Sequence, residues 1–349
     1  MPDMARTATG GSRVRIGLIG YGYWGPNLLR NFIKSPDCEV VAVADRDEQR
    51  LSGIARVFPG LRTLRSADDL LSDKGIDAVV ISTPISTHCD LASRALARGK
   101  HVLVEKPMAS TVAQASRLVA LADRRRLTLM VDHTFIYSGA VKTIKGLVQS
   151  GDVGDVYYYD SVRVNLGLFQ QDVNVLWDLA PHDFSIMSHV LNAKPKTVWA
   201  VGACLPHSKG WKTESVAYVT IEFADGMLAH FHLNWLSPVK VRRTLIGGSK
   251  RMIVYDHLDP DNQVKVFDKG VEMHSESERY QLLVQYRAGD MWAPKIDQTE
   301  ALETVCRHFL QCVTTGAPPL SDGQAGLDNV RLLAAAERSL RHQGKAVKL

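Results

Sequence analysis

The sequence predicts an α/β domain with a doubly wound parallel sheet, followed by an α+β domain built on a largely antiparallel open sheet. A chain of 349 residues is too long for one ordinary domain and fits two. Apolar runs alternate with amphipathic stretches in the first third of the chain, whereas strand follows strand after about residue 150. We therefore expect one domain at residues 12–135 and a second at residues 136–349.

The first domain is expected to contain short strands rich in valine and isoleucine, at residues 14–19, 39–44, 77–82, 101–104 and 127–131. Their mostly apolar composition is typical of parallel strands that are buried on both faces. Between them, helices are expected at residues 26–34, 47–57, 67–72, 88–98 and 111–125. This repeated β-α-β order indicates a doubly wound sheet.

The second domain is expected to be mostly strands, at residues 156–164, 197–205, 215–223, 227–235, 242–246, 251–255 and 263–267. Turn signals at residues 224–226 and 247–249 predict two hairpins, and hairpins make an antiparallel sheet. Helices are expected at residues 298–314 and 323–342, and the last is a candidate to pack back on the first domain. These helices are too few to cover both faces of the sheet, so we expect a homodimer or homotetramer built through it.

Composition excludes several classes of protein. The net charge of +5 is small and spread along the chain, so nothing indicates nucleic acid as a partner. The five cysteines form no CxxC pair, which indicates reduced thiols and a cytoplasmic location. Residues 1–11 are polar and are expected to be a disordered tail rather than a signal peptide. No apolar run reaches about 18 residues, so we expect no membrane span.

A glycine-rich turn directly follows the first strand, with the sequence Gly20-Tyr21-Gly22-Tyr23-Trp24-Gly25. The spacing GxGxxG between a strand and a helix predicts a dinucleotide site in a Rossmann domain. Gly20 allows the tight turn, Gly22 lets a pyrophosphate approach the backbone, and Gly25 lets helix and strand pack closely. The phosphates are expected at the positive end of the helix, with Tyr23 and Trp24 beside them. The alternative is a glycine-rich turn that binds nothing.

Asp45 ends the second strand, 20 residues after Gly25, where the dinucleotide motif has its acidic residue. A carboxylate there accepts hydrogen bonds from the ribose hydroxyls of NAD and repels the 2′-phosphate of NADP. The neighbouring Arg46 complicates this choice, because arginine can bind that phosphate. We expect NAD as the cofactor.

Glu105, Lys106 and Pro107 follow the strand at residues 101–104. Ligands of open α/β sheets bind at the carboxyl ends of the strands, so Lys106 is expected beside the nicotinamide. A surface Glu-Lys pair at the end of a strand is an equally good interpretation of these residues alone.

Asp178 and His182 are four residues apart and share a face if this segment is helical. Histidine has a near-neutral pKa, which suits a base that removes the hydroxyl proton during hydride transfer. Asp178 would orient that histidine or bind a substrate hydroxyl. For this pair alone, an ordinary surface ion pair is the more frequent explanation.

Together these motifs, with Ser82-Thr83-Pro84 and His88, resemble the glucose-fructose oxidoreductase/inositol dehydrogenase/MocA family over residues 13–340. The specific part is the Glu-Lys-Pro triplet combined with the later DxxxH. The resemblance implies that Lys106 polarises the reacting oxygen, that His182 is the acid/base, and that Asp178 helps hold the substrate. It also implies cofactor contacts, which fall on Thr83, Pro84, His88, Glu105 and Lys106.

Two segments, at residues 21–32 and 172–184, resemble family members of nucleotide-sugar and surface-polysaccharide pathways, which act at C3 of a hexose. His182 stands where some ketoreductase relatives carry tyrosine. With Asp45, it favours oxidation of the sugar. The alternatives are an inositol or simple-sugar dehydrogenase, a ketoreductase running in reverse, or a silent dinucleotide-binding regulator.

Other polar residues are candidates for substrate contact. His133 and Tyr137 follow the last strand of the first domain, and Arg163 and Asn165 share one face of the strand that opens the second. Arg163 would suit a diphosphate, although a surface arginine is equally ordinary.

No metal site is expected. His230 and His232 share a strand face but have no third ligand in the sequence. Trp177 is either a wall of the substrate pocket or a core residue.

Overall fold

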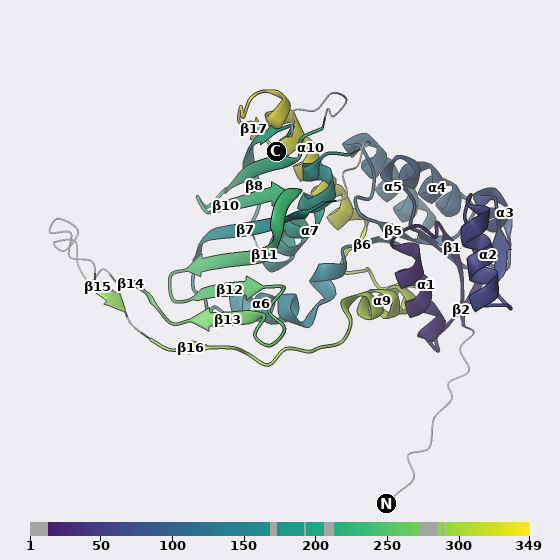
Figure 1. Cartoon of the computed structure of the whole chain (residues 1–349), viewed down its shortest axis with the longest axis horizontal. Coiled ribbons are helices and arrows are strands. Elements are labelled where there is room, and N and C mark those ends of the chain that lie inside the picture. The colour runs from purple at the N-terminus through teal and green to yellow at the C-terminus, as the bar shows by residue number, and fades with distance from the viewer. Residues whose placement is uncertain (1–12, 168–172, 192, 206–212, 273–284, 288) are drawn as a thin grey trace, which may run out of the picture.

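The computed structural model describes residues 13–167, 173–191, 193–205, 213–272, 285–287 and 289–349. The expected N-terminal tail lies outside these residues. Within them, two large sheets form most of the protein, with the N-terminal α/β unit on one side and the C-terminal sheet on the other (Figure 1). No helix in the described ranges is long and apolar enough to cross a membrane.

The first sheet is parallel and six-stranded in the order β3-β2-β1-β4-β5-β6. Its strands are β1 (Val14–Ile19), β2 (Cys38–Ala44), β3 (Arg62–Leu64), β4 (Ala78–Ile81), β5 (His101–Glu105) and β6 (Leu129–Asp132). The strand order reverses between β1 and β4, which is the point where an open α/β sheet binds its ligand. The predicted doubly wound sheet is confirmed, except that the sequence missed β3, whose three residues carry too short a pattern.

Five helices connect these strands: α1 (Gly25–Lys34), α2 (Glu48–Val57), α3 (Ala67–Ser72), α4 (Ile85–Ala97) and α5 (Val112–Arg125). Side chains of Asp47, Ser66 and Thr111 cap α2, α3 and α5. By contrast, α1 and α4 start without a side-chain cap, at Trp24 and Pro84. Both uncapped helices follow the two strands at the reversal point, so helix N-termini gather there.

The second sheet has nine strands in the described part of the chain, in the order β16-β13-β12-β11-β7-β10-β9-β8-β17. They are β7 (Val156–Leu166), β8 (Pro195–Ala203), β9 (Val216–Phe223), β10 (Leu228–Asn234), β11 (Leu236–Gly248), β12 (Met252–Asp256), β13 (Val264–Phe267), β16 (Met291–Trp292) and β17 (Val347–Lys348). Both predicted hairpins, β9–β10 and β11–β12, are confirmed. The pair of β7 and β10 is parallel, so the sheet is mixed. A separate pair, β14 (Gly270–Glu272) and β15 (Gln285–Arg287), lies apart from both sheets (Figure 1).

Helices cover one face of the second sheet. They are α7 (Val175–Val190) and α10 (Gly323–Arg341), with α6 (Gly139–Gln149) packed on α7. Helix α9 (Ala301–Thr315) packs on α1 and on the 3-10 turn η1 (Thr134–Tyr137). The sequence missed the extent of α7, because its apolar residues surround the helix and leave no amphipathic pattern. Helix α10 packs on β8 and also on α5 and β6, so the chain's last helix joins the two sheets.

The other face of the second sheet carries partly exposed apolar side chains. Val201, Tyr218 and Leu228 are 53%, 40% and 48% exposed. His230 and His232 lie on this face too, stacked against Tyr218. A face of this kind on a β-sheet is suited to contact with another molecule.

A buried ion pair holds α7 on the sheet. The Arg163 side chain on β7 donates two hydrogen bonds to the carboxylate of Asp183 on α7, with N–O distances of 2.8 and 2.9 Å. Both residues are less than 5% exposed. A buried ion that loses its partner has neither a counter-ion nor water to stabilise it. Substitution of either Arg163 or Asp183 should therefore weaken the packing of α7 on the sheet.

We expect Asp183→Ala to lower the free energy of unfolding by about 3–5 kcal/mol, because it leaves the Arg163 charge buried and unpaired. Urea unfolding followed by circular dichroism measures this. The matched control is Asp328→Ala, which breaks an exposed pair with Arg331 and should cost at most about 1 kcal/mol. Equal stability losses in the two variants would contradict the assignment.

Candidate active site

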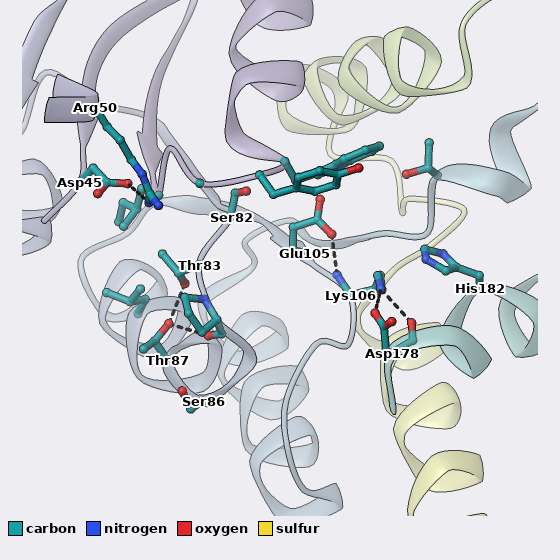
Figure 2. A pocket seen from close by; sticks show the side chains of 18 of the residues that line it. Asp45, Arg50, Ser82, Thr83, Ser86, Thr87, Glu105, Lys106, Asp178 and His182 are labelled. Carbon is teal, nitrogen blue, oxygen red and sulfur yellow. Dashed lines mark hydrogen bonds and ion pairs between the residues drawn. The ribbon is translucent and has the colours of Figure 1, made fainter. Parts of the chain in front are cut away.

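A cleft of about 1540 Å³ lies between the two sheets. It runs from the ends of β1 and β2, past the end of β5, to α7, β7 and β11. Asp45 and Arg50 mark one end, and Lys106, Asp178 and His182 mark the other (Figure 2). A typical site for one small ligand is about 300–1,000 Å³, so this cleft has room for two.

The three glycines of the motif, Gly20, Gly22 and Gly25, have different structural roles in the turn before α1. Gly20 has φ +95°, and a Cβ on it would lie 2.3 Å from the carbonyl oxygen of Ser82. A Cβ on Gly25 would lie 2.3 Å from the carbonyl oxygen of Gly20. Gly22 faces open space, where a Cβ would meet only the end of Arg50, at 3.6 Å. Gly20 and Gly25 are therefore needed for the turn itself, and Gly22 leaves the backbone open to a ligand at the uncapped start of α1.

Asp45 holds the glycine turn at the end of β2. Its carboxylate accepts hydrogen bonds from the backbone N–H of Tyr21 at 2.6 Å and of Asp47 at 2.8 Å. Arg50, which the sequence reading missed, lies 3.7 Å from the same carboxylate. Arg46 also lines this end of the cleft. The carboxylate of Asp45 therefore lies beside the cleft, at an end that Arg50 and Arg46 also line.

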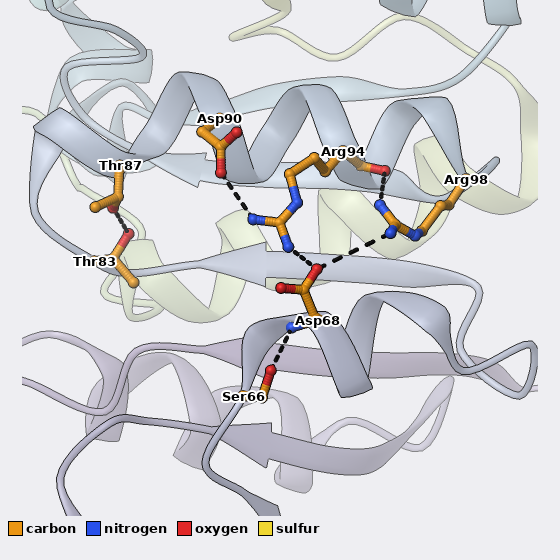
Figure 3. A network of polar contacts seen from close by, with 7 residues as sticks. All are labelled: Ser66, Asp68, Thr83, Thr87, Asp90, Arg94 and Arg98. Atoms are coloured by element: carbon orange, nitrogen blue, oxygen red, sulfur yellow. Dashed lines mark hydrogen bonds and ion pairs between the residues drawn. The ribbon is translucent and has the colours of Figure 1, made fainter.

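The segment after β4 forms the floor of the cleft. Thr83 and Pro84 line it, and the hydroxyl of Thr83 lies 2.6 Å from that of Thr87. In the network of Figure 3, Arg94 on α4 binds Asp90 on its own helix and Asp68 on α3. These contacts tie α4 to α3 along the rim.

His88 does not line the cleft, contrary to the expected cofactor contact. It is 1% exposed, and its ring nitrogens lie 2.9 Å from the carbonyl oxygen of Pro107 and 2.7 Å from that of Thr83. His88 thus joins the segments that follow β4 and β5 from behind. The first turn of α4 begins at Ile85, so His88 comes one turn later, on the side that faces the core.

Glu105, which lines the cleft, lies beside the buried Asp132 at the ends of β5 and β6. Glu105 accepts a hydrogen bond from the backbone N–H of Lys106 at 3.1 Å, and Asp132 accepts one from the indole of Trp24 at 3.2 Å. Burial raises the pKa of both carboxyls, and in Glu105 the negative charge of Asp132 raises it further. Close buried carboxylates favour retention of a proton. Asp132, which the sequence reading did not single out, thereby links Trp24 to the end of β5.

Lys106 meets Asp178 across the cleft. Its Nζ donates a hydrogen bond to the main-chain oxygen of Asp178 at 3.0 Å and lies 3.5 Å from the carboxylate. The indole of Trp235 donates to the same carboxylate at 3.0 Å. Lys106 and Asp178 are 72 residues apart in sequence, and the fold brings them together.

His182 lies one helical turn after Asp178 on α7, and both side chains line the cleft. Burial lowers the pKa of His182 well below 6.5, and the positive charges of Lys106, Arg163 and Arg242 lower it further. The imidazole is therefore neutral at pH 7 and can accept a proton. Its Nδ1 is buried without a hydrogen-bond partner among the described residues.

His133 and Tyr137 do not line the cleft, so the substrate contacts expected of them are corrected. His133 is 2% exposed, and burial lowers its pKa to about 3. The Tyr137 hydroxyl lies 2.9 Å from that of Ser321 in the core. The 3-10 turn rotates these two residues inward and turns Thr134 and Phe135 toward the cleft instead.

Arg163 and Asn165 line the cleft from β7, as alternation along the strand predicted. The charge of Arg163 is already matched by Asp183, which the sequence reading did not identify. Trp177 is a core residue: it is 7% exposed, and its indole donates to Glu337 at 3.2 Å.

The end of the cleft near His182 also contains Phe135, together with three residues that the sequence reading missed: Lys240, Arg242 and His257. The Phe135 ring lies at the centre of this group of side chains. The rings of His182 and His257 lie 4.9 and 5.1 Å from it, and the guanidinium carbons of Arg163 and Arg242 lie 4.9 and 6.0 Å from it. The only signal for this group in the sequence is the alternation of basic residues along β11.

No cluster of three or more histidine, cysteine or acidic residues that could hold a metal occurs in the described part of the chain.

Two family models match the chain. One, described as an oxidoreductase family with an NAD-binding Rossmann fold, matches residues 14–133. The other, the GFO/IDH/MocA C-terminal domain, matches residues 141–254. The two matches fall on the two sheets, and the first identifies the coenzyme of the N-terminal domain as NAD.

Curated relatives act on more than one kind of substrate. The dTDP-3,4-didehydro-2,6-dideoxy-alpha-D-glucose 3-reductase of Streptomyces violaceoruber is 37% identical over 129 residues, 37% of this chain and 37% of that protein. The myo-inositol 2-dehydrogenase of Thermotoga maritima is 24% identical over 351 residues, 96% of this chain and 98% of that protein. The chain spans about half the length, or less, of the first curated relatives that it matches.

Among solved structures, UDP-N-acetylglucosamine 3-dehydrogenase GnnA from Acidithiobacillus ferrooxidans has a TM-score of 0.79 to this chain. The identity is 23%, over 95% of this chain and 99% of that chain. At this identity the likeness establishes a shared fold.

Proposed function

The chain belongs to the GFO/IDH/MocA oxidoreductase family, and we propose that it is an NAD-dependent dehydrogenase that oxidises C3 of a nucleotide-linked hexose. One observation carries the proposal: Lys106, Asp178 and His182 gather at one end of a cleft whose other end is the glycine turn. A silent dinucleotide-binding protein has no use for this set of residues.

The N-terminal domain supplies the cofactor site. NAD⁺ supplies the hydride acceptor when bound. Gly22 and the uncapped start of α1 would hold its pyrophosphate, and Asp45 would accept hydrogen bonds from its ribose hydroxyls. Thr83, Pro84, Glu105 and Lys106 line the cleft between this end and the reaction centre.

His182 acts as the base and Lys106 as the electrostatic partner. As the C–H bond breaks, the substrate hydroxyl must lose its proton, and the neutral imidazole of His182 takes it. The ammonium of Lys106 stabilises the negative charge that develops on the oxygen. Asp178 holds that ammonium through its carboxylate and main-chain oxygen, and Trp235 holds Asp178. A neutral histidine is ready to accept a proton, which favours oxidation.

The second candidate is oxidation of a free inositol, favoured by the nearly full-length match to a myo-inositol 2-dehydrogenase. Incubating the protein with NAD⁺ and a panel of nucleotide sugars and inositols, and following the nicotinamide absorbance, decides between them. NADH formation with a nucleotide sugar supports the proposal. NADH formation with inositols alone, or with no member of the panel, counts against it. We also propose a cytoplasmic location, because the five cysteines are scattered along the sequence and form no CxxC pair.

We expect NAD(H) to bind more tightly than NADP(H). Asp45→Asn should reduce this difference in affinity, because it removes the negative charge that repels a 2′-phosphate. Calorimetry with both reduced coenzymes measures the ratio. Asn keeps an oxygen that can accept the Tyr21 N–H, whereas Asp45→Ala loses that contact and should also weaken NADH. Tighter binding of NADP(H) to the wild type would refute this preference.

We expect His182→Ala to lower kcat by about 10²–10⁴-fold with little change in NADH affinity, because it removes the base. The matched control is His189→Ala, the same substitution near the end of the same helix and outside the cleft lining, which should leave kcat unchanged.

The pH profile adds a second readout for His182. Because its pKa lies well below 6.5, activity of the wild type should be insensitive to this ionisation at pH 7 and fall as the pH drops through that lower pKa. Near wild-type turnover in His182→Ala, or an acid limb that persists in that variant, would rule out the histidine as the base.

We propose that the protein is a homodimer or homotetramer assembled through the exposed face of the second sheet. Tyr218→Lys and Val201→Lys place charge in the apolar part of that face and should shift the assembly toward monomer. Light scattering measures the mass, with Leu166→Lys, an exposed apolar residue at the end of β7, as the control. A wild-type mass of 38.6 kDa at micromolar concentration would refute the assembly.

A further inference from the structure

We propose that Lys240 and Arg242 form an anion-binding subsite that recognises the diphosphate of the substrate. This inference rests on the proposed function, and it identifies the residues that would select a nucleotide-linked sugar over a neutral one.

The charges at the substrate end are unbalanced. Lys106 is paired with Asp178, and Arg163 is paired with Asp183. Among the described residues, neither Lys240 nor Arg242 has a carboxylate within ion-pair distance, and the Nε of Arg242 is buried without a hydrogen-bond partner. Two positive charges therefore remain at this end of the cleft.

Arg242 lies next to a like charge in the sheet. In the register of β11 and β7, Arg242 lies directly opposite Arg163. Like charges opposite one another destabilise a sheet, and Asp183 already neutralises Arg163. Burial and the charge of Arg163 lower the pKa of Arg242, and the charge of Arg242 lowers that of Lys240. An anionic ligand between them would relieve this repulsion.

An irregularity in β11 brings the two side chains to the cleft. Pairing with β7 jumps from Leu236 to Val241, so residues 237–240 leave the ladder. Pro238, which has no N–H to donate, lies in this segment. Lys240 and Arg242 both line the cleft, whereas Arg243 lies on the opposite face and pairs with Asp256. Arg243 is therefore a matched control on the same strand.

Arg242 and the proposed base lie against the same aromatic ring. His182 and Arg242 lie 4.9 and 6.0 Å from the centre of the same Phe135 ring, so their separation is at most the sum of these distances. In a nucleotide sugar the diphosphate is attached to C1 of the ring whose C3 reacts. Its two negative charges match the two free cations, whereas a sugar carboxylate supplies one and an inositol none. Hydrogen bonds from the guanidinium of Arg242 and the ammonium of Lys240 to phosphate would be charge-assisted and therefore strong.

The test uses UDP, dTDP and inorganic pyrophosphate as probes, in calorimetry on the full-length protein saturated with NADH so that the cofactor site is filled. We expect Arg242→Gln to weaken binding of these probes about 10- to 100-fold, since a charge-assisted contact is lost. Lys240→Gln, at an exposed position that does not threaten folding, should weaken it by a smaller factor. Arg243→Gln should leave it unchanged.

Four outcomes would overturn the subsite. Equal loss in Arg243→Gln would show a general charge effect. A loss of NADH affinity in Arg242→Gln and Lys240→Gln, with probe binding unchanged, would assign the pair to the coenzyme. No binding of the probes to the wild type, or tighter binding of glucuronate than of UDP, would exclude a diphosphate.

The subsite and the proposed function can fail separately. Probe binding that depends on Arg242, without NADH formation from any nucleotide sugar, supports the subsite and refutes the proposed reaction. NADH formation from nucleotide sugars with a KM unchanged in Arg242→Gln supports the reaction and overturns the subsite.

Discussion

The contact between Lys106 and Asp178 is the constraint on which the rest of the cleft depends. It joins the carboxyl end of β5 in the parallel sheet to helix α7 on the second sheet. Lys106 is placed by a strand whose central residues are fully buried, and Asp178 by a helix that the buried Arg163–Asp183 pair holds on β7. Each domain thus contributes one rigid half of the proposed reaction centre, and rigid elements position reacting groups better than loops do.

Charge balance divides the cleft into regions with different tasks. At the proposed reaction centre the ammonium of Lys106 has a carboxylate partner, and the nearby histidines are neutral because burial and neighbouring cations oppose their protonation. On β11 the two cations that line the cleft, Lys240 and Arg242, have no such partner among the described residues, whereas Arg243 on the opposite face pairs with Asp256. A neutral base beside unpaired cations fits a reaction in which a proton is removed from a substrate that carries negative charge elsewhere.

The two ends of the cleft are built in different ways. The cofactor end comes from neighbouring stretches of chain: the glycine turn, the uncapped start of α1 and the end of β2. The substrate end combines η1, β7, α7 and β11, which are far apart in sequence, around the ring of Phe135. This difference explains why the sequence pointed to the cofactor in detail and to the substrate only in outline.

The sequence by itself determined the features that depend on local patterns: five of the six strands of the first sheet, the turn from Gly20 to Gly25, and the shared helix face of Asp178 and His182. Only the tertiary structure decided which neighbours of these motifs face the cleft. A 3-10 turn buries His133 and Tyr137 and presents Phe135, and an irregular β11 presents Arg242. The reason is physical: periodicity assigns a side chain to a face of its own helix or strand, but packing against distant segments decides whether that face meets the core or the ligand.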